Sequence, residues 1–226
     1  GLPFLLGCVS ESSIPQSIRS SCLGILSTLA QNNPHVQREL LEMGACKTLS
    51  DLFFASSSSA SSKSLQAKVM QAMSSMVRNN EIAEEVFCKL PQAPALFMKG
   101  LALSEGNNST SLRTKSLFFL KALLTSDAST PERVKTFQTA IIHIVDHYLD
   151  VELSPDLREM AISLLEQVFG RTLLSLEILA GGRKDVLVAR AVQRIAQIRA
   201  LTGEGTEFAQ TELEHWENLL VVLARG

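Results

Sequence analysis

The sequence is poor in the residues on which several common functions depend. Aromatic residues make up only 5% of the 226 residues, so aliphatic side chains must fill the core. A formal net charge of −2 argues against a nucleic-acid-binding protein, which carries a surplus of Lys and Arg along one face. No apolar run reaches the roughly 18 to 20 residues that span a bilayer. These absences predict a soluble protein that binds neither nucleic acid nor membrane.

The four cysteines form no recognisable framework. Cys8, Cys22, Cys46 and Cys88 are widely separated, and no two of them form a C-x-x-C pair. Three of them lie among apolar positions of expected helices, where free cysteine packs as a small apolar residue. The pattern therefore predicts buried thiols rather than a set of disulfide bonds.

Histidine offers little material for an enzyme, since the chain has only four. His143 and His147 are four residues apart on an expected helix and could share a metal ion with a neighbouring aspartate. The zinc-protease pattern, however, requires glutamate directly after the first histidine, where this chain has Ile144. We favour a half-exposed helix that carries two polar rings. The sequence therefore predicts no enzyme, no metal, no cofactor and no catalytic residue.

Two short motifs are also weak. Gly181 and Gly182 precede Lys184, but a P-loop needs a preceding strand and a Ser or Thr after its lysine. Asn107 and Asn108 match the N-glycosylation pattern, which matters only in the secretory pathway. Neither motif predicts a function by itself.

The most informative feature present is an internal repeat. Residues 17–33 (SIRSSCLGILSTLAQNN), residues 64–80 (SLQAKVMQAMSSMVRNN) and a segment from residue 111 (SLRTKSLFFLKALL) align without gaps at a constant offset of 47. A fourth copy follows 45 residues after the third, with Leu157 at the position of Leu112. A period of this size is typical of stacked helical repeats, whose extended face usually binds another macromolecule.

Each copy carries apolar residues at three- and four-residue steps, which predicts one buried stripe per helix. The stripes are Ile18, Cys22, Ile25, Leu26 and Leu29; Leu65, Val69, Ala72, Met73 and Met76; Leu112, Ser116, Phe119, Leu120 and Leu123; Leu157, Ala161, Leu164, Leu165 and Val168. One position stays small in all copies (Cys22, Val69, Ser116 and Ala161), as expected where two helices approach closely.

Shorter apolar-periodic segments follow each long helix, so the repeat is a helical triplet. Asn33, Thr130 and Ser154 each precede a proline, the arrangement of an N-cap followed by proline at the first helical position. No segment has a convincing strand pattern. We therefore predict an all-α, armadillo-like solenoid, a right-handed superhelix of about four three-helix repeats plus capping helices.

This solenoid is predicted to be a single domain over residues 1–226. The repeats are expected near residues 17–54, 64–103, 111–150 and 154–200, with a C-terminal cap at residues 206–226. Trp216 is expected to close the hydrophobic end of the stack, although as the single tryptophan it could also anchor a partner. Because Gly1 is followed at once by an apolar segment, we expect the chain to begin inside a longer protein.

The residues of these repeats resemble a known family. Residues 29–37 (LAQNNPHVQ) are similar to a run in armadillo-type nucleotide exchange factors of the 70-kDa heat-shock chaperone, the Hsp70-binding protein family. Residues 68–78 (KVMQAMSSMVR) and 113–120 (RTKSLFFL) resemble the next two repeats of that family. The resemblance is good over residues 1–124 and loose beyond them.

The resemblance implies a monomeric co-chaperone whose concave face binds the nucleotide-binding domain of the chaperone and promotes ADP release. It implies a cytoplasmic protein or one of the endoplasmic reticulum lumen. Free cysteines favour the cytoplasm, and the two glycosylation patterns point faintly to the lumen.

Exposed polar residues that recur in register, or match basic positions of the family, are the candidates for partner contact. They are Asn32, Asn33, Lys68, Arg78, Arg113 and Lys115. Arg and Lys complement an acidic chaperone surface. The asparagines could equally be helix caps, and Arg113 and Lys115 could be an ordinary solvated flank of their helix.

A second function remains open from the sequence alone, namely a generic armadillo adaptor that holds a peptide or protein in its concave groove. Armadillo proteins of that kind resemble one another in a ladder of Trp and Asn residues or in a strongly basic groove. With a single Trp near its end, this chain fits that pattern less well.

Overall fold

The computed structural model forms two compact units, Gly1–Ala128 and Ser129–Gly226. The residues that it describes are 1–56, 60–103, 107–150, 153–171, 175–201 and 205–225. Every regular element among these residues is a helix, which confirms the all-α prediction. The two units divide the chain after the third long helix, and the single domain remains a prediction.

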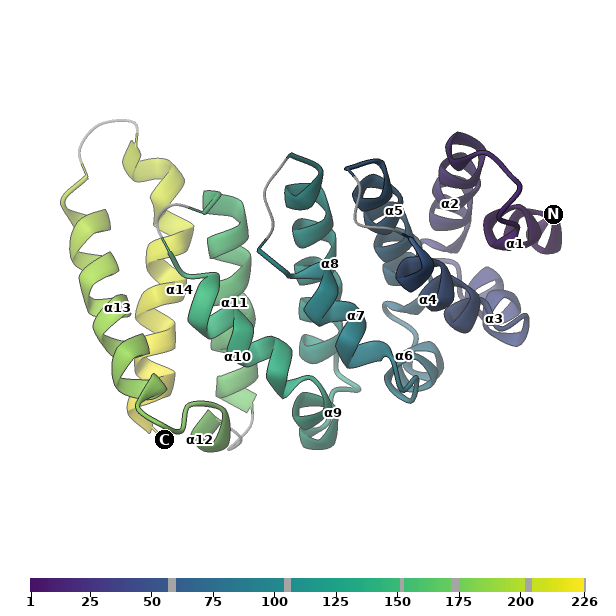
Figure 1. Ribbon diagram of the computed structural model, residues 1–226. Coiled ribbons are helices and arrows are strands. Elements are labelled where there is room, and N and C mark those ends of the chain that lie inside the picture. The colour runs from purple at the N-terminus through teal and green to yellow at the C-terminus, as the bar shows by residue number, and fades with distance from the viewer. Residues whose placement is uncertain (57–59, 104–106, 151–152, 172–174, 202–204, 226) are drawn as a thin grey trace. The chain divides into compact units, whose positions relative to one another are not determined.

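In the first unit, two short helices lie between successive long ones along the chain (Figure 1). Its helices are α1 (Leu2–Ser10), α2 (Gln16–Ala30), α3 (Pro34–Glu42), α4 (Ala45–Ala55), α5 (Ala60–Val77), α6 (Glu81–Cys88), α7 (Ala93–Gly100) and α8 (Asn107–Thr125). The long helices α2, α5 and α8 pack side by side, and the short helices α4 and α7 pack on one another. The predicted helical triplet is therefore confirmed in this unit.

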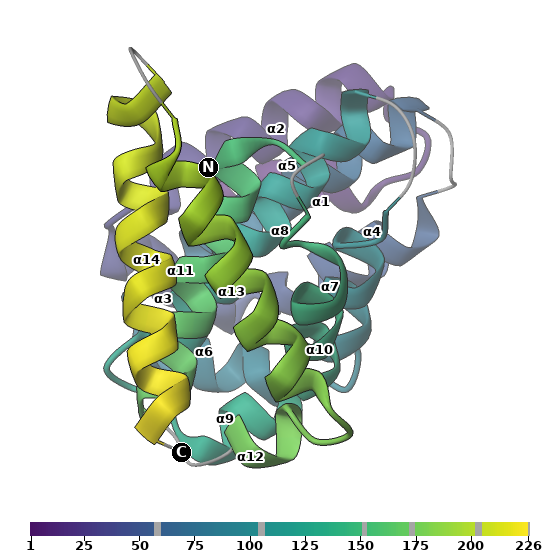
Figure 2. The ribbon, with the colours of Figure 1, turned by 90° about the vertical axis from the view of Figure 1, so that its left-hand side faces the viewer.

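The second unit departs from this arrangement, since its last two helices are both long. Its helices are α9 (Pro131–Thr136), α10 (Gln138–His147), α11 (Pro155–Arg171), α12 (Ser175–Ile178), α13 (Arg183–Arg199) and α14 (Gly205–Arg225). The last helix, α14, packs against both α11 and α13 (Figure 2). Trp216 on α14 is fully buried, as expected for a residue of the core.

Local sequence explains where several helices begin and end. The side chain of Asn33 accepts a hydrogen bond from the backbone N–H of Val36 at 3.3 Å, and Thr130 accepts one from Arg133 at 3.2 Å, so both are the predicted N-caps. Gly44, with φ of 72°, separates α3 from α4. The helix α5 begins at Ala60, within a run of Ser and Ala residues, and α8 begins at Asn107.

The predicted buried stripes are confirmed on α5, α8 and α11, whose stripe residues are each no more than 5% exposed. On α2 the prediction is wrong for three residues, since Ile18, Ile25 and Leu29 are 49%, 47% and 41% exposed. The physical reason is the packing of neighbours. The long helix before α5 is α2, and the one before α8 is α5, whereas no long helix precedes α2 among the described residues.

Close helix approach at the small register position is confirmed in the third repeat. Ser116 is fully buried on α8, and a Cβ added to Gly100 of α7 would collide with its Oγ atom. The Ser116 hydroxyl donates to the carbonyl oxygen of Leu112 at 2.8 Å, so its polarity is satisfied inside the helix. A glycine opposite a small residue therefore allows α7 to lie close to α8.

Candidate functional site

The exposed side of the long helices in the first unit forms a continuous surface, which we call the long-helix face. On α5 it contains Lys68 and Gln71, and on α8 it contains Lys115 and Phe118. These positions correspond exactly by the offset of 47, and because α5 packs beside α8, the two pairs lie on adjoining helices. Arg78, the residue that follows α5, completes the face. Its five members are thus Lys68, Gln71, Arg78, Lys115 and Phe118.

The composition of these helices makes the face electropositive. The sequences of α2, α5 and α8 together contain six basic residues and no Asp or Glu, although the whole chain has a net charge of −2. Lys68 is exposed and Lys115 is half-buried, and neither has an ion-pair partner among the described residues. With no carboxylate on the same helices to neutralise them, both ammonium groups are available to an acidic partner.

Arg78 and Phe118 join α5 to α8 on this face. The guanidinium carbon of Arg78 lies 4.6 Å from the centre of the Phe118 ring, in the geometry of a cation–π contact. Partial burial lowers the pKa of Arg78, but a guanidinium remains protonated in proteins. The Nε atom of Arg78 is buried and has no hydrogen-bond partner among the described residues, while Phe118 remains 41% exposed. The pair therefore presents both a charge and an apolar ring.

Asn32 and Asn33 lie at the end of α2, and the structure assigns a local role to each. Asn32 has a φ of 53°, the left-handed conformation that asparagine tolerates better than most residues. Asn33 caps α3, as described above. In the next repeat Asn79 has a φ of 59°, and Asn80 caps α6 by accepting from the backbone N–H of Ala83 at 3.1 Å. The recurrence of the Asn pair is therefore explained by backbone geometry, and both side chains of the first pair are also exposed.

Arg113 lies apart from the long-helix face. The corresponding residues of the first two repeats are Arg19 on α2 and Gln66 on α5. The Nε atom of Arg19 donates to the carbonyl oxygen of Val9 on α1 at 3.0 Å. The Nε2 atom of Gln66 donates to the carbonyl oxygen of Phe53 on α4, also at 3.0 Å. Arg113 itself donates to the hydroxyl of Thr110 at 3.2 Å. This register position faces the short helices, so the structure does not bring Arg113 together with Lys115.

Sequence reasoning missed Gln71 and Phe118 as members of the face. Two signals in the sequence could have found them. Both residues lie three positions after a candidate lysine, the spacing that places side chains on one side of a helix. In addition, all three of the aligned long helices lack Asp and Glu, which is unusual for surface helices of an acidic chain.

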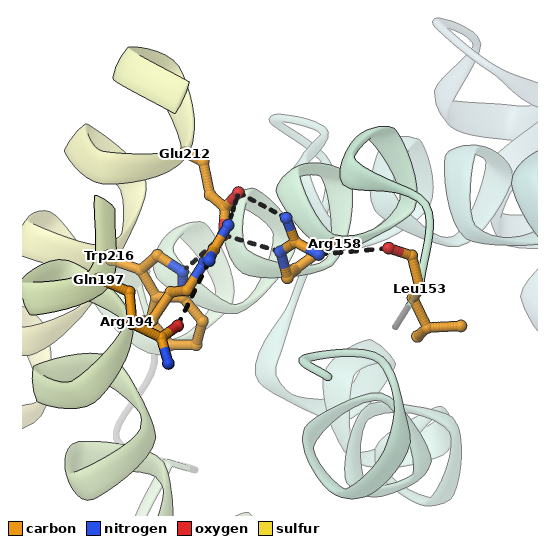
Figure 3. A network of polar contacts seen from close by, with 6 residues as sticks. All are labelled: Leu153, Arg158, Arg194, Gln197, Glu212 and Trp216. Atoms are coloured by element: carbon orange, nitrogen blue, oxygen red, sulfur yellow. Dashed lines mark hydrogen bonds and ion pairs between the residues drawn. The ribbon is translucent and has the colours of Figure 1, made fainter. Parts of the chain in front are cut away.

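The second unit contains a different polar cluster, which is buried (Figure 3). Arg158 donates to the Glu212 carboxylate through Nε at 2.7 Å and through Nη2 at 2.8 Å, and Arg194 donates to it at 2.8 and 3.1 Å. The indole N–H of Trp216 donates to the same carboxylate at 3.2 Å. Burial alone would raise the pKa of Glu212, but the hydrogen bonds and charges of the two arginines outweigh it and lower the pKa to about 2.

This cluster joins three helices of the second unit, since Arg158 lies on α11, Arg194 on α13 and Glu212 on α14. Arg158 and Glu212 are 3% and 4% exposed, so they hold the helices together and do not face a partner. Sequence reasoning did not identify these residues, because their separation of 54 positions follows no repeat offset.

The histidine pair and the two short motifs show no arrangement of side chains that would bind a ligand among the described residues. The rings of His143 and His147 lie 4.7 Å apart on α10, and the described residues include no group of three His, Cys, Asp or Glu side chains suited to a metal ion. Gly181 and Gly182, with φ of 70° and 83°, form the turn before α13. The side chains of Asn107 and Asn108 lie outside the described residues. None of the described helices is both long and apolar enough to cross a bilayer.

Comparison with protein families gives a match over most of the chain. Residues 1–168 match the SIL1/FES1/HPBP1 C-terminal domain. The chain belongs to this family. It is the family of nucleotide exchange factors of the 70-kDa heat-shock chaperone, so the resemblance stated from the sequence is confirmed, and with it the co-chaperone class. Among curated proteins none matches the chain.

Solved structures similar to this chain include designed armadillo repeat proteins and other engineered proteins. A designed armadillo repeat protein in complex with the peptide (KR)4 has a TM-score of 0.59 and 15% identity, over 95% of this chain and 99% of that one. A second designed armadillo repeat protein has a TM-score of 0.52 and 14% identity, over 99% and 100%. An engineered protein has a TM-score of 0.64 and 12% identity, over 96% and 97%. These matches confirm the armadillo-like fold.

Proposed function

We propose that this protein binds the nucleotide-binding domain of a 70-kDa heat-shock chaperone and promotes release of ADP from it. The observation that carries the proposal is the family match over residues 1–168, which includes all of the first unit. The long-helix face lies within the matched residues. No bond is made or broken by this protein in such a role.

The long-helix face is the surface that we assign to the chaperone. Lys68 and Lys115 project from adjoining helices without internal ion pairs, and Arg78 has a buried N–H that lacks an acceptor among the described residues. Such groups gain most from carboxylates on a partner, because the partner supplies the charge and the acceptor that the unit itself does not. Phe118 adds apolar contact area beside them. Asn32 and Asn33 belong to the proposed surface as exposed neighbours at the end of α2.

Nucleotide release follows from linkage between two binding equilibria. If the solenoid binds best to a chaperone whose lobes are displaced, and that displaced form holds ADP poorly, then binding the solenoid lowers ADP affinity. The coupling is reciprocal, so ADP must weaken binding of the solenoid by the same factor. We further propose that the protein acts as a monomer in the cytoplasm, where buried thiols such as that of Cys46 would remain reduced.

Stopped-flow release of a fluorescent ADP analogue from a purified 70-kDa chaperone tests the proposal. The release rate should rise with the concentration of this protein and then saturate. The double variant Lys68→Glu/Lys115→Glu should shift the concentration dependence to higher values by at least tenfold. Lys47→Glu is the matched control, because Lys47 is an exposed lysine on α4 that already pairs with Asp51 at 2.6 Å. A flat response to the unmodified protein would refute the function.

A titration of ADP separates the surface assignment from the function itself. Affinity of this protein for the chaperone should fall as ADP is added, by the same factor by which this protein lowers the equilibrium affinity of the chaperone for ADP. If release is accelerated but the double variant and the Lys47→Glu control behave alike, the function holds and the long-helix face is the wrong surface.

A further inference from the structure

The short helix α3 contacts the end of α5 through one buried amide. Gln37 lies on α3 and is 2% exposed. Its Nε2 atom donates to the carbonyl oxygens of Ser75 and Arg78 at 3.0 and 3.2 Å. Its Oε1 atom accepts a hydrogen bond from Nδ2 of Asn80 at 3.0 Å. Both the nitrogen and the oxygen of this buried amide therefore have partners in the turn that follows α5.

These hydrogen bonds hold the backbone on the carboxyl side of Arg78. The last carbonyl groups of a helix have no partner within that helix, and at the end of α5 the side chain of Gln37 supplies one. The N–H of Arg78 donates to the carbonyl oxygen of Ser74 at 3.0 Å, and the next residue, Asn79, has a φ of 59°. Arg78 therefore lies between a helix end and a left-handed residue, with its own carbonyl group fixed by a different helix.

The side chain of Arg78 depends on this backbone because it reaches across to α8. Its guanidinium carbon lies 4.6 Å from the centre of the Phe118 ring, and its Nε atom is buried. A cation–π contact requires the cation to lie over the face of the ring, so movement of the end of α5 would weaken it. Gln37 is itself too deeply buried to touch a partner. Any effect of Gln37 on binding must therefore pass through residues such as Arg78.

The same register position is used differently in the next repeat. Glu84 on α6 lies 47 residues after Gln37 and is also 2% exposed. Its carboxylate accepts a hydrogen bond from the hydroxyl of Ser126, just after α8, at 2.7 Å. The residue that corresponds to Arg78 in that repeat is Thr125, which carries no charge. The position joins a short helix to the end of the next long helix in both repeats, but of the two residues Gln37 is the one that holds a member of the long-helix face.

We propose that Gln37 is a positioning residue of the long-helix face. By anchoring the backbone of Arg78, it holds the guanidinium over Phe118, where a carboxylate of the chaperone meets it. The inference rests on the proposed function, and it assigns a role in binding to α3, a helix that contributes no residue to the face.

A double-mutant cycle, measured by calorimetric titration against the chaperone, tests this role. Gln37→Met keeps the length of the side chain and removes its hydrogen bonds to Ser75, Arg78 and Asn80. We expect it to weaken the complex by about threefold, against about tenfold for Arg78→Ala, which removes an arginine anchor. The double variant should bind no more weakly than Arg78→Ala alone, because the two changes act through one side chain.

Gln66→Met is the matched control for loss of a buried glutamine. Gln66 is 3% exposed on α5, and its Nε2 atom donates to the carbonyl oxygen of Phe53 at 3.0 Å, on the side that faces the short helices. This variant should lower the melting temperature and leave the affinity for the chaperone unchanged. Equal weakening by Gln37→Met and Gln66→Met would overturn the proposal. So would a loss of affinity from Gln37→Met that persists in the Arg78→Ala background.

Gln37→Glu provides a second variant if Gln37→Met does not fold. A carboxylate fits at this register position, since Glu84 occupies it in the next repeat. At neutral pH the new side chain can still accept from Asn80 but cannot donate to the two carbonyl oxygens. We expect the same Arg78-dependent loss of affinity, and an unaltered affinity would contradict the proposal.

Nuclear magnetic resonance of the arginine side chains tests the positioning without the chaperone. The buried Nε–H of Arg78, assigned with the variant Arg78→Lys, should exchange with water slowly in the unmodified protein and faster in Gln37→Met. The Nε atom of Arg113 is also buried, and its signal should be the same in both proteins. An Arg78 signal that Gln37→Met leaves unchanged would overturn the positioning role. If the signal changes but the unmodified protein does not bind the chaperone, the proposed function fails and the positioning of Arg78 by Gln37 stands.

Discussion

The long helices of the two units differ most in their charges. Those of the first unit, α2, α5 and α8, carry six basic and no acidic residues, whereas α11, α13 and α14 of the second unit carry eight acidic and eight basic residues. The same type of helix therefore serves two purposes. In the first unit the charges remain on the surface and are unpaired by their own helices, while in the second unit the central charges are buried against one another.

The contacts that join neighbouring repeats differ in the same way. In the first unit they include neutral pairs as well as the buried carboxylate of Glu84, which accepts a hydrogen bond from the hydroxyl of Ser126 at 2.7 Å. The hydroxyls of Ser27 and Ser75 hydrogen-bond at 2.8 Å, and the buried amide of Gln37 donates to the carbonyl oxygens of Ser75 and Arg78 at 3.0 and 3.2 Å. In the second unit the helices are joined by the ion pairs of Glu212 with Arg158 and Arg194. Lys68 and Lys115 take no part in these contacts, so both remain available to a partner.

The largest expected effect is on the stability of the second unit. Glu212→Gln would leave Arg158 buried without a counter-charge, so we expect a loss of about 3 to 5 kcal/mol in the free energy of unfolding. Urea unfolding followed by circular dichroism measures it. Glu214→Gln on the same helix is the control, since Glu214 is exposed and its change should cost less than about 0.5 kcal/mol. Equal losses in the two variants would show that the buried cluster does not stabilise the unit.

Lowering the pH should destabilise the second unit before the first. The folded-state pKa of Glu212 is about 2, below its ordinary value of 4.5, so the unfolded chain binds this proton more tightly than the folded one. The contribution of Glu212 to stability is complete above pH 4.5 and is lost as the pH falls towards about 2. Hydrogen exchange across this range should show α14 losing protection before α5. Loss in the opposite order would contradict the comparison.

Charge reversal on the long-helix face should change binding and leave stability almost unaltered. Lys115→Glu places a carboxylate where the proposed partner is acidic, so we expect about a tenfold weaker complex, or about 1.4 kcal/mol. Calorimetric titration against the chaperone measures the affinity, and the melting temperature should stay nearly unchanged because Lys115 has no internal ion pair among the described residues. Unaltered affinity would mean that Lys115 does not face the partner.

The smallest expected effect is that of replacing Asn33, and it distinguishes a capping role of this residue from a role in binding the chaperone. Asn33→Ala removes the acceptor for the Val36 N–H and should cost about 1 kcal/mol of stability. If capping is the role of Asn33, the affinity of Asn33→Ala for the chaperone should be unchanged. The variant Asn32→Asp tests in the same assay whether the exposed neighbour contacts the chaperone. A loss of affinity in Asn33→Ala, at a temperature where the variant is fully folded, would assign this residue to the partner surface as well.

Much of the architecture follows from the sequence alone. The offset of 47 and the three- and four-residue apolar steps predict the long helices, and the Asn-Pro and Thr-Pro pairs predict where α3 and α9 begin. These features are local, because helix periodicity and capping depend on residues within one or two turns. The family could also be recognised, since its motifs lie within single helices.

Only the tertiary structure decides which side of each helix is covered. Ile18, Ile25 and Leu29 fit the same apolar pattern as their buried counterparts on α5, yet they are exposed because burial depends on the neighbouring helix and not on the pattern. Arg113 and Lys115 are two residues apart in the sequence, and packing against the short helices places them on different sides of α8. Contacts such as that of Glu212 with Arg158 arise between helices, so no local rule of sequence could have predicted them.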